Sequence, residues 1–185
     1  MSRNRKNKRR AERVEPPAPA ATPKEPVLWI AAVLALAFAF RLWRLAADLP
    51  VVGDESIYLR WAEIIDNQGR WFVSLLDGKP PLTYWLYAAA RQVFDDPLVG
   101  PRLLSVLAGT AATGMIYAVA RRLASAQAAL AAAGLYAVLP WAMLYDRLAY
   151  AEAWVNLVGV ALVWASLRAH RDRCAFAVRT ADQVG

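Results

Sequence analysis

Charged side chains that could do acid–base or phosphate chemistry occur at three places in this 185-residue sequence. Asp54 and Glu55 form an adjacent acidic pair, Lys79 precedes two prolines, and Arg147 stands five residues before Glu152. A carboxylate can take a proton from a hydroxyl group, and a lysine or arginine can stabilise a phosphate. Together, these residue types suit a phosphate-bearing lipid substrate that reacts with a hydroxyl acceptor.

Each of these signals also has a purely structural interpretation. Acidic residues in the first turn of a helix complement the helix dipole, which would account for Asp54 and Glu55. Lys79 could be an ordinary loop lysine with its charged end in water. An ionisable residue inside a membrane span indicates a function by default, but Glu152 lies near the end of its predicted span, where the cost is smaller.

The composition is that of a membrane protein. Hydrophobic residues make up 58% of the chain and occur in blocks, against about 45–50% apolar residues in an average soluble domain. This excludes a fully disordered chain and argues against a water-soluble globule. The single cysteine excludes an internal disulfide and a cysteine-cluster metal site, and the single histidine excludes paired-histidine zinc motifs.

Most of the net charge of +7 lies in residues 1–26, which hold eight basic and three acidic residues together with five prolines. Such a segment buries too little apolar surface to fold, so we expect a disordered cytoplasmic tail beside a membrane span. No aromatic residue occurs before Trp29 that could stack on bases, so the sequence predicts no nucleic-acid partner.

Apolar stretches predict an all-α fold, a polytopic membrane helix bundle with four spans. The predicted spans cover about residues 27–45, 103–120, 126–144 and 148–167. Arg41 and Arg44 are expected to snorkel at the end of the first span. A further apolar stretch, 81–94, is about 14 residues long, which is short for a span and suits an aromatic helix at the membrane interface.

The basic residues set the predicted orientation. With four spans, Arg121-Arg122 and the basic residues of a C-terminal tail, 169–185, all lie in the cytoplasm, as the positive-inside rule requires. If 81–94 crossed the membrane, those clusters would change sides, so a fifth span is the alternative. We therefore expect both termini in the cytoplasm of a cell with an inner membrane, and one long outer loop, 46–102.

The outer loop is expected to contain an amphipathic helix. Ile57, Trp61, Ile64 and Ile65 recur at helical spacing, which predicts a helix lying on the membrane surface with Asp54 and Glu55 in its first turn. In the four-span arrangement, the charged candidates all face the outer side: Asp54, Glu55, Lys79, Arg147 and Glu152.

The order of motifs resembles the N-terminal part of the polytopic membrane glycosyltransferases related to protein O-mannosyltransferases and the lipid A aminoarabinose transferase. The resemblance covers about residues 27–168. The segments that carry it are Gly-Asp-Glu from Gly53, Gly-Arg-Trp from Gly69, Lys-Pro-Pro-Leu-x-Tyr-Trp-Leu from Lys79, Pro-Arg-Leu-Leu-Ser-x-Leu-Ala-Gly from Pro101, Ala-Arg-Arg-Leu from Ala120 and Arg-Leu-Ala-Tyr-Ala-Glu from Arg147.

This resemblance implies a GT-C-like fold whose first outer loop forms a catalytic face. It implies inverting transfer of a sugar from a polyprenyl-phosphate donor to a hydroxyl acceptor outside the cytoplasm. Asp54, with Glu55 beside it, would be the catalytic carboxylate. Lys79 and Arg147 would bind the donor phosphate, and Glu152 would be a second acidic site. Arg102 matches a recurring arginine to which no role is assigned.

The sequence also departs from the family pattern. Gly78 stands where the aminoarabinose branch has an acid linked to metal binding, and Glu152 stands where aspartate is commoner. The sequence assigns no cofactor, and a divalent metal ion held with the help of Asp54 stays open. Family members are longer, with more than ten spans, so the missing spans would come from a second chain. The alternative is a truncated, non-catalytic membrane protein or scaffold that retains the first half of the fold.

Overall fold

The computed structural model describes residues 26–45 and 50–184, and every regular element in these ranges is a helix. The expected all-helical fold is thus confirmed. In chain order, the elements are α2 (Val27–Leu42), α3 (Gly53–Gln68), the 3-10 helix η1 (Val73–Asp77), α4 (Leu82–Arg91), α5 (Val99–Leu123), α6 (Ala126–Val138), α7 (Pro140–Tyr145) and α8 (Glu152–Val184). The N-terminal tail predicted for residues 1–26 lies almost wholly outside the described residues.

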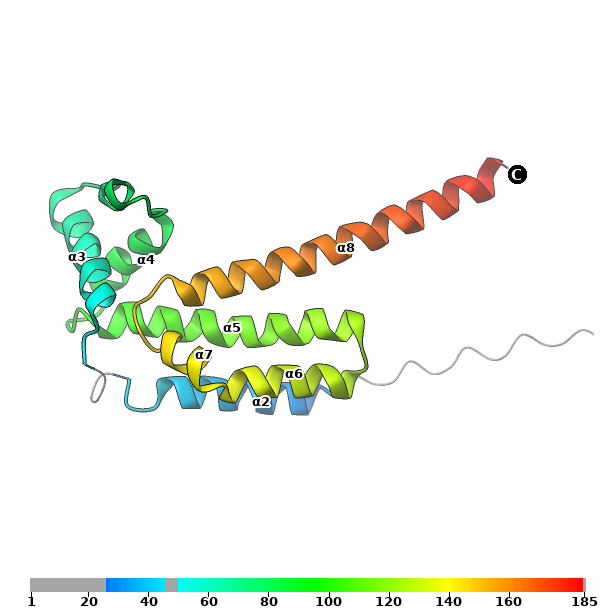
Figure 1. Ribbon diagram of the computed structural model, residues 1–185, viewed down its shortest axis with the longest axis horizontal. Helices are drawn as coiled ribbons and strands as arrows, with labels where there is room; N and C mark the ends of the chain where they lie inside the picture. The colour runs from blue at the N-terminus through cyan, green and yellow to red at the C-terminus, as the bar shows by residue number, and fades with distance from the viewer. Residues whose placement is uncertain (1–25, 46–49, 185) are drawn as a thin grey trace, which may run out of the picture.

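The helices form a bundle with a separate small unit at one end (Figure 1). Helices α2, α5 and α6 pack on one another, and α8 packs along α5 before it extends beyond the bundle. Helices α3 and α4, with η1 between them, lie at the end where α5 begins. This unit contains most of the predicted outer loop, so the charged residues of that loop gather at one end of the molecule.

One helix in the described part of the chain, α5, is both long and apolar enough to cross a membrane. It has 25 residues, or about 37 Å at 1.5 Å per residue, whereas the apolar helices α2 and α6 have 16 and 13 residues. The arrangement with four spans and its orientation therefore stay predictions. Helix α4, with 10 residues, is short, as expected for the stretch 81–94.

The helix bounds differ from the predicted spans at two places. The stretch 126–144 is two helices rather than one, because Leu139 adopts an extended conformation (ψ 117°) before Pro140, as the residue before a proline prefers. The stretch 148–167 begins as a loop, and helix α8 begins only at Glu152. Residues 146–151 are held in this loop by contacts to other elements, which the sequence pattern does not reveal.

Arg41 does not snorkel but is fully buried in the bundle. Its guanidinium donates to the buried Asp146 carboxylate over 2.9 Å and to the carbonyl oxygens of Ala37 and Ala137 over 3.1 and 3.2 Å. Asp146 fits there only because α5 has a glycine beside it. A Cβ atom on Gly109 would lie 2.3 Å from the Asp146 carboxyl carbon. This ion pair joins the end of α2 to the loop after α7.

Candidate active site

Helix α3 places its two acidic residues in different surroundings. Its first turn contains Asp54, which is exposed, and Glu55, which is fully buried. No side chain caps the helix, so neither acid is explained as a cap. Their position still complements the helix dipole. Of the four apolar residues expected to face the membrane, Ile65 is buried in a core shared with α4, Trp61 and Ile64 are half-buried, and Ile57 is exposed.

The Glu55 carboxylate forms an ion pair with Arg102, which lies near the start of α5. The two side chains form a bidentate ion pair, with Nε–Oε1 and Nη2–Oε2 distances of 2.8 and 2.7 Å. The backbone N–H of Ala149 donates to Oε1 over 2.8 Å. Arg102 also donates to the carbonyl oxygens of Leu45 and Pro50. Glu55 therefore ties α3, α5 and the loop 146–151 together.

This ion pair changes the interpretation of the predicted catalytic pair. A buried carboxylate with three charge-assisted or backbone hydrogen bonds is a positioning group, and the exposed Asp54 is the carboxylate that can meet a substrate. The arrangement also gives Arg102 a role that sequence reasoning missed. One sequence signal could have revealed this role: Arg102 directly precedes the apolar stretch 103–120, and a charge that is buried there requires a partner of opposite charge.

Lys79 is held above the rings of α3. Its ammonium group donates to the Tyr58 hydroxyl over 2.8 Å and lies 4.5 Å from the centre of the Tyr58 ring and 5.7 Å from that of Trp61. The Asp77 carboxylate is 3.8 Å away. The side chain keeps 35% of its surface exposed, so the cation is fixed in direction yet accessible to a ligand.

The surroundings raise the pKa of Lys79 above its usual 10.5. The hydrogen bond to Tyr58 is the main cause, and the negative charges of Asp77 and Asp54 act in the same direction, against a smaller opposing effect of burial. Lys79 is consequently a cation at neutral pH. Asp54 lies one helical turn before Tyr58, whose hydroxyl accepts from Lys79, so these two predicted site residues belong to one region of the structure.

Four aromatic side chains form what we call the aromatic floor: Tyr58, Trp61, Tyr84 and Tyr150. The ring centre of Tyr58 lies 5.7, 5.3 and 5.7 Å from those of Trp61, Tyr84 and Tyr150. The buried Tyr87 hydroxyl donates to the backbone oxygen of Tyr150 over 2.8 Å and so holds the loop against α4. Rings that pack in stacked, tilted and edge-to-face pairs make a base beneath Lys79.

Arg147 has a different neighbour from Lys79. It is half-buried, and its guanidinium donates to the carbonyl oxygen of Trp43, just after α2 ends. The loop that carries it is fixed on both sides by the Asp146–Arg41 pair and by the Ala149–Glu55 hydrogen bond. Arg147 thus contacts the end of α2, whereas Lys79 contacts Tyr58 of α3. That both bind one donor phosphate stays a prediction.

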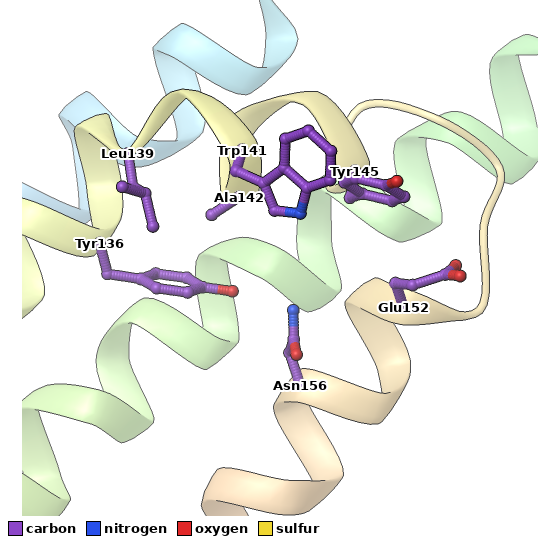
Figure 2. Close-up of a pocket in the computed structure, with 7 residues that line it drawn as sticks. All are labelled: Tyr136, Leu139, Trp141, Ala142, Tyr145, Glu152 and Asn156. Atoms are coloured by element: carbon purple, nitrogen blue, oxygen red, sulfur yellow. The ribbon is translucent and has the colours of Figure 1, made fainter.

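Glu152 lies at a pocket of about 370 Å³ between α6, α7 and α8 (Figure 2). The pocket is lined by Tyr136, Leu139, Trp141, Ala142, Tyr145, Glu152 and Asn156. In Figure 2, the Asn156 side chain points into the pocket between Tyr136 and Trp141, whereas the exposed Glu152 carboxylate is directed toward the loop before α8. Aromatic walls with an amide and a carboxylate suit a ligand that is partly apolar and partly hydroxylated.

A series of ring contacts connects this pocket with the aromatic floor. Trp141 and Tyr145 have ring centres 5.0 Å apart, and Tyr145 lies 5.7 Å from Tyr150, which belongs to the floor. The pocket and the Lys79 site are therefore linked by packed rings, which come from α7, from the loop before α8 and from the α3–α4 unit.

A metal site is not evident in the part of the chain that the structure describes. No group of three or more histidine, cysteine, aspartate or glutamate side chains in residues 26–45 and 50–184 could hold a metal ion. Asp54 therefore belongs to no such group among the described residues, and the neighbouring Glu55 pairs with Arg102.

Comparison with known proteins finds a family and a relative. Residues 78–178 match the dolichyl-phosphate-mannose-protein mannosyltransferase family. The chain is 32% identical over 134 residues to an undecaprenyl phosphate-alpha-4-amino-4-deoxy-L-arabinose arabinosyl transferase of Pseudomonas aeruginosa (strain LESB58). This alignment covers 66% of the chain and 24% of the relative, so the chain spans about a quarter of that relative's length. No solved structure matches the chain.

Since the family match covers more than half of its residues, the chain belongs to the dolichyl-phosphate-mannose-protein mannosyltransferase family. The resemblance expected from the order of motifs is confirmed. The family match includes Lys79, the loop 146–151 and Glu152, whereas Asp54 and Glu55 lie before it.

Proposed function

We propose that this chain carries the catalytic face of a membrane glycosyltransferase that moves a sugar from a polyprenyl-phosphate donor to a hydroxyl acceptor. The observation that carries the proposal is an exposed carboxylate, Asp54, placed one helical turn before Tyr58 on α3, together with an accessible cation, Lys79, that donates to the hydroxyl of the same Tyr58. The reaction takes place on the extracytoplasmic side of an inner membrane, as the distribution of basic residues favours.

In this mechanism, Asp54 accepts the proton of the acceptor hydroxyl. The acceptor oxygen attacks the anomeric carbon of the sugar, and the bond between that carbon and the phosphate oxygen breaks. The bonding electrons leave with the polyprenyl phosphate, whose added negative charge Lys79 stabilises. The exposed position of Asp54 in the first turn of α3 leaves its carboxylate open to the acceptor.

The other predicted residues have supporting tasks. Glu55 and Arg102 hold α3 on α5 and thereby set the position of Asp54. Arg147 is a second candidate for binding the donor phosphate. Its guanidinium donates to the Trp43 carbonyl through Nη2 and would bind the phosphate through its other N–H groups. Glu152, at the rim of the pocket, can bind hydroxyl groups of a sugar through its carboxylate.

The proposal is tested by sugar transfer in membranes that contain the chain and a radiolabelled polyprenyl-phosphate sugar. Asp54→Asn removes the proton acceptor while keeping the size of the side chain. The matched control is Asp95→Asn, which changes another exposed aspartate, after the end of α4. The proposal expects transfer by the unmodified chain and by Asp95→Asn, and loss of transfer by Asp54→Asn.

Two results would count against it. Transfer that survives Asp54→Asn would exclude Asp54 as the proton acceptor. No transfer by the unmodified chain would favour the non-catalytic alternative, a truncated membrane protein or scaffold, and would leave the enzyme hypothesis dependent on a second chain.

A further inference from the structure

A short segment of the α3–α4 unit exposes large apolar side chains. Trp71, Phe72, Leu75 and Leu76 are 55, 60, 52 and 87% exposed, and they lie together in residues 70–76, which we call the 70–76 segment. They are neighbours in one turn, whereas single exposed apolar residues are common on any protein surface. A gathered apolar patch of this kind marks a contact surface.

Two glycine turns and two hydrogen bonds hold the 70–76 segment in the conformation that exposes these side chains. Gly69 and Gly78, with φ angles of +64° and +68°, turn the chain at the two ends of the segment, in a conformation that glycine adopts without strain. The Trp85 indole donates to the backbone oxygen of Trp71 over 2.6 Å, and the Ser74 hydroxyl donates to that of Lys79 over 3.0 Å.

These bonds fix which side chains point inward. Ser74 is buried and Val73 packs against the core of the unit, so the apolar side chains on either side of them must face outward. Phe72 and Trp85 also pack edge to face, with ring centres 5.7 Å apart. The patch is consequently a fixed feature of the surface.

A cation accompanies the apolar patch. Arg70 is exposed, and its side chain makes no hydrogen bond or ion pair with any residue that the structure describes. It lines a groove of about 390 Å³ together with Trp71, Phe72 and Leu76. A guanidinium beside aromatic and aliphatic side chains complements a phosphate group attached to apolar chains, because guanidinium forms paired hydrogen bonds with phosphate.

We propose that the 70–76 segment docks on the phospholipid surface of the bilayer at the end of the bundle where α5 begins. The α3–α4 unit lies at that end, and α5 is long enough to cross the membrane (Figure 1). The apolar side of α3 offers less exposed surface than this segment, because Ile65 is buried and Trp61 is half-buried, which leaves Ile57 at 44% exposed. Tryptophan and arginine favour the interface, where an apolar body and a polar group are both satisfied.

The test places an environment-sensitive nitrobenzoxadiazole label on the full chain in vesicles of phosphatidylethanolamine and phosphatidylglycerol. Cys174→Ser removes the native thiol, and a new cysteine is introduced by Leu76→Cys. The matched control is Asn67→Cys, an exposed polar position on α3 in the same unit. Lipids with a nitroxide near the headgroup quench labels that enter the interface.

The proposal expects the label at position 76 to emit at shorter wavelength than at position 67 and to be quenched by the nitroxide lipid, with position 67 unquenched. Replacing Trp71 and Phe72 by serine in the same background should reduce the quenching. Equal emission and no quenching at position 76 would overturn the proposal. A shift to shorter wavelength without quenching by lipid would also overturn it, since protein would then cover the patch.

Discussion

Asp54 and Glu55 are neighbours in the chain, yet their carboxylates meet different surroundings. Because successive residues of a helix point about 100° apart, Asp54 faces the solvent while Glu55 faces Arg102 and the N–H of Ala149. The sequence predicted that an acidic pair would stand in the first turn of a helix. It could not assign the two acids separately, since Arg102 lies 47 residues further along.

Glu55→Gln should destabilise the protein because it leaves the buried Arg102 guanidinium without a compensating charge. Removing one partner of a buried ion pair costs about 3–5 kcal/mol. Thermal unfolding in detergent would show this as a lower midpoint than that of the unmodified chain. Asp54→Asn, at an exposed position, serves as the control and should unfold at the original temperature. Equal midpoints for Glu55→Gln and the control would refute the structural role of Glu55.

Tyr58→Phe should lower the pKa of Lys79. The hydrogen bond that the Tyr58 hydroxyl accepts from the Lys79 ammonium group is the main cause of the raised pKa, and the substitution removes it while keeping the ring beneath the cation. Lys79 would then lose its charge at lower pH than in the unmodified chain. A titration followed by NMR of the labelled lysine carbon next to Nζ measures this directly. An unchanged pKa would mean that the hydrogen bond does not hold the cation.

At the scale of elements, the loop 146–151 joins the parts of the site. Asp146 binds Arg41 from α2, and Ala149 binds Glu55 from α3. The apolar stretches of the sequence indicated α5 well and also the short aromatic helix α4. They placed residues 145–147 between two spans, but they did not indicate that the loop continues to residue 151, because residues 148–151 are as apolar as a span. What keeps it from being helical is tertiary contact.

Gly109→Ala should weaken the packing of α5 against this loop. A Cβ atom at this position would lie 2.3 Å from two atoms of the Asp146 carboxyl group, so the Arg41–Asp146 pair would have to move. Overpacking of this kind costs about 1–3 kcal/mol. The control is Gly134→Ala in α6, where a Cβ atom meets nothing within 4 Å. Thermal unfolding should show a loss of stability for Gly109→Ala and none for the control.

At the scale of the whole molecule, a helix bundle carries a charged and aromatic unit at one end (Figure 1). The sequence predicted the class of fold and the family, because apolar blocks and the order of motifs are local properties. The pairing of Arg41 with Asp146 joins residues 105 positions apart, and no local pattern specifies it. For the same reason, Arg41 was expected at the membrane surface and is found in the interior.

The positive-inside rule predicts where each end of the bundle lies. An alkaline phosphatase fusion after residue 95, in the outer loop, should be active, since that enzyme folds only outside the cytoplasm. A fusion after residue 185 should be inactive, and a green fluorescent protein fusion there should fluoresce. The opposite pattern at residue 185 would indicate the arrangement with five spans, in which the C-terminal basic residues change sides.

We propose that Asp54 takes the acceptor proton while Glu55 holds the fold. The rate of sugar transfer per folded molecule for Asp54→Asn, with the folded amount determined by thermal unfolding of the same sample, distinguishes these two roles. We expect a rate lower by about 10²–10⁴-fold, as for loss of a general base, at unchanged stability. A transfer rate equal to that of the unmodified chain would contradict it.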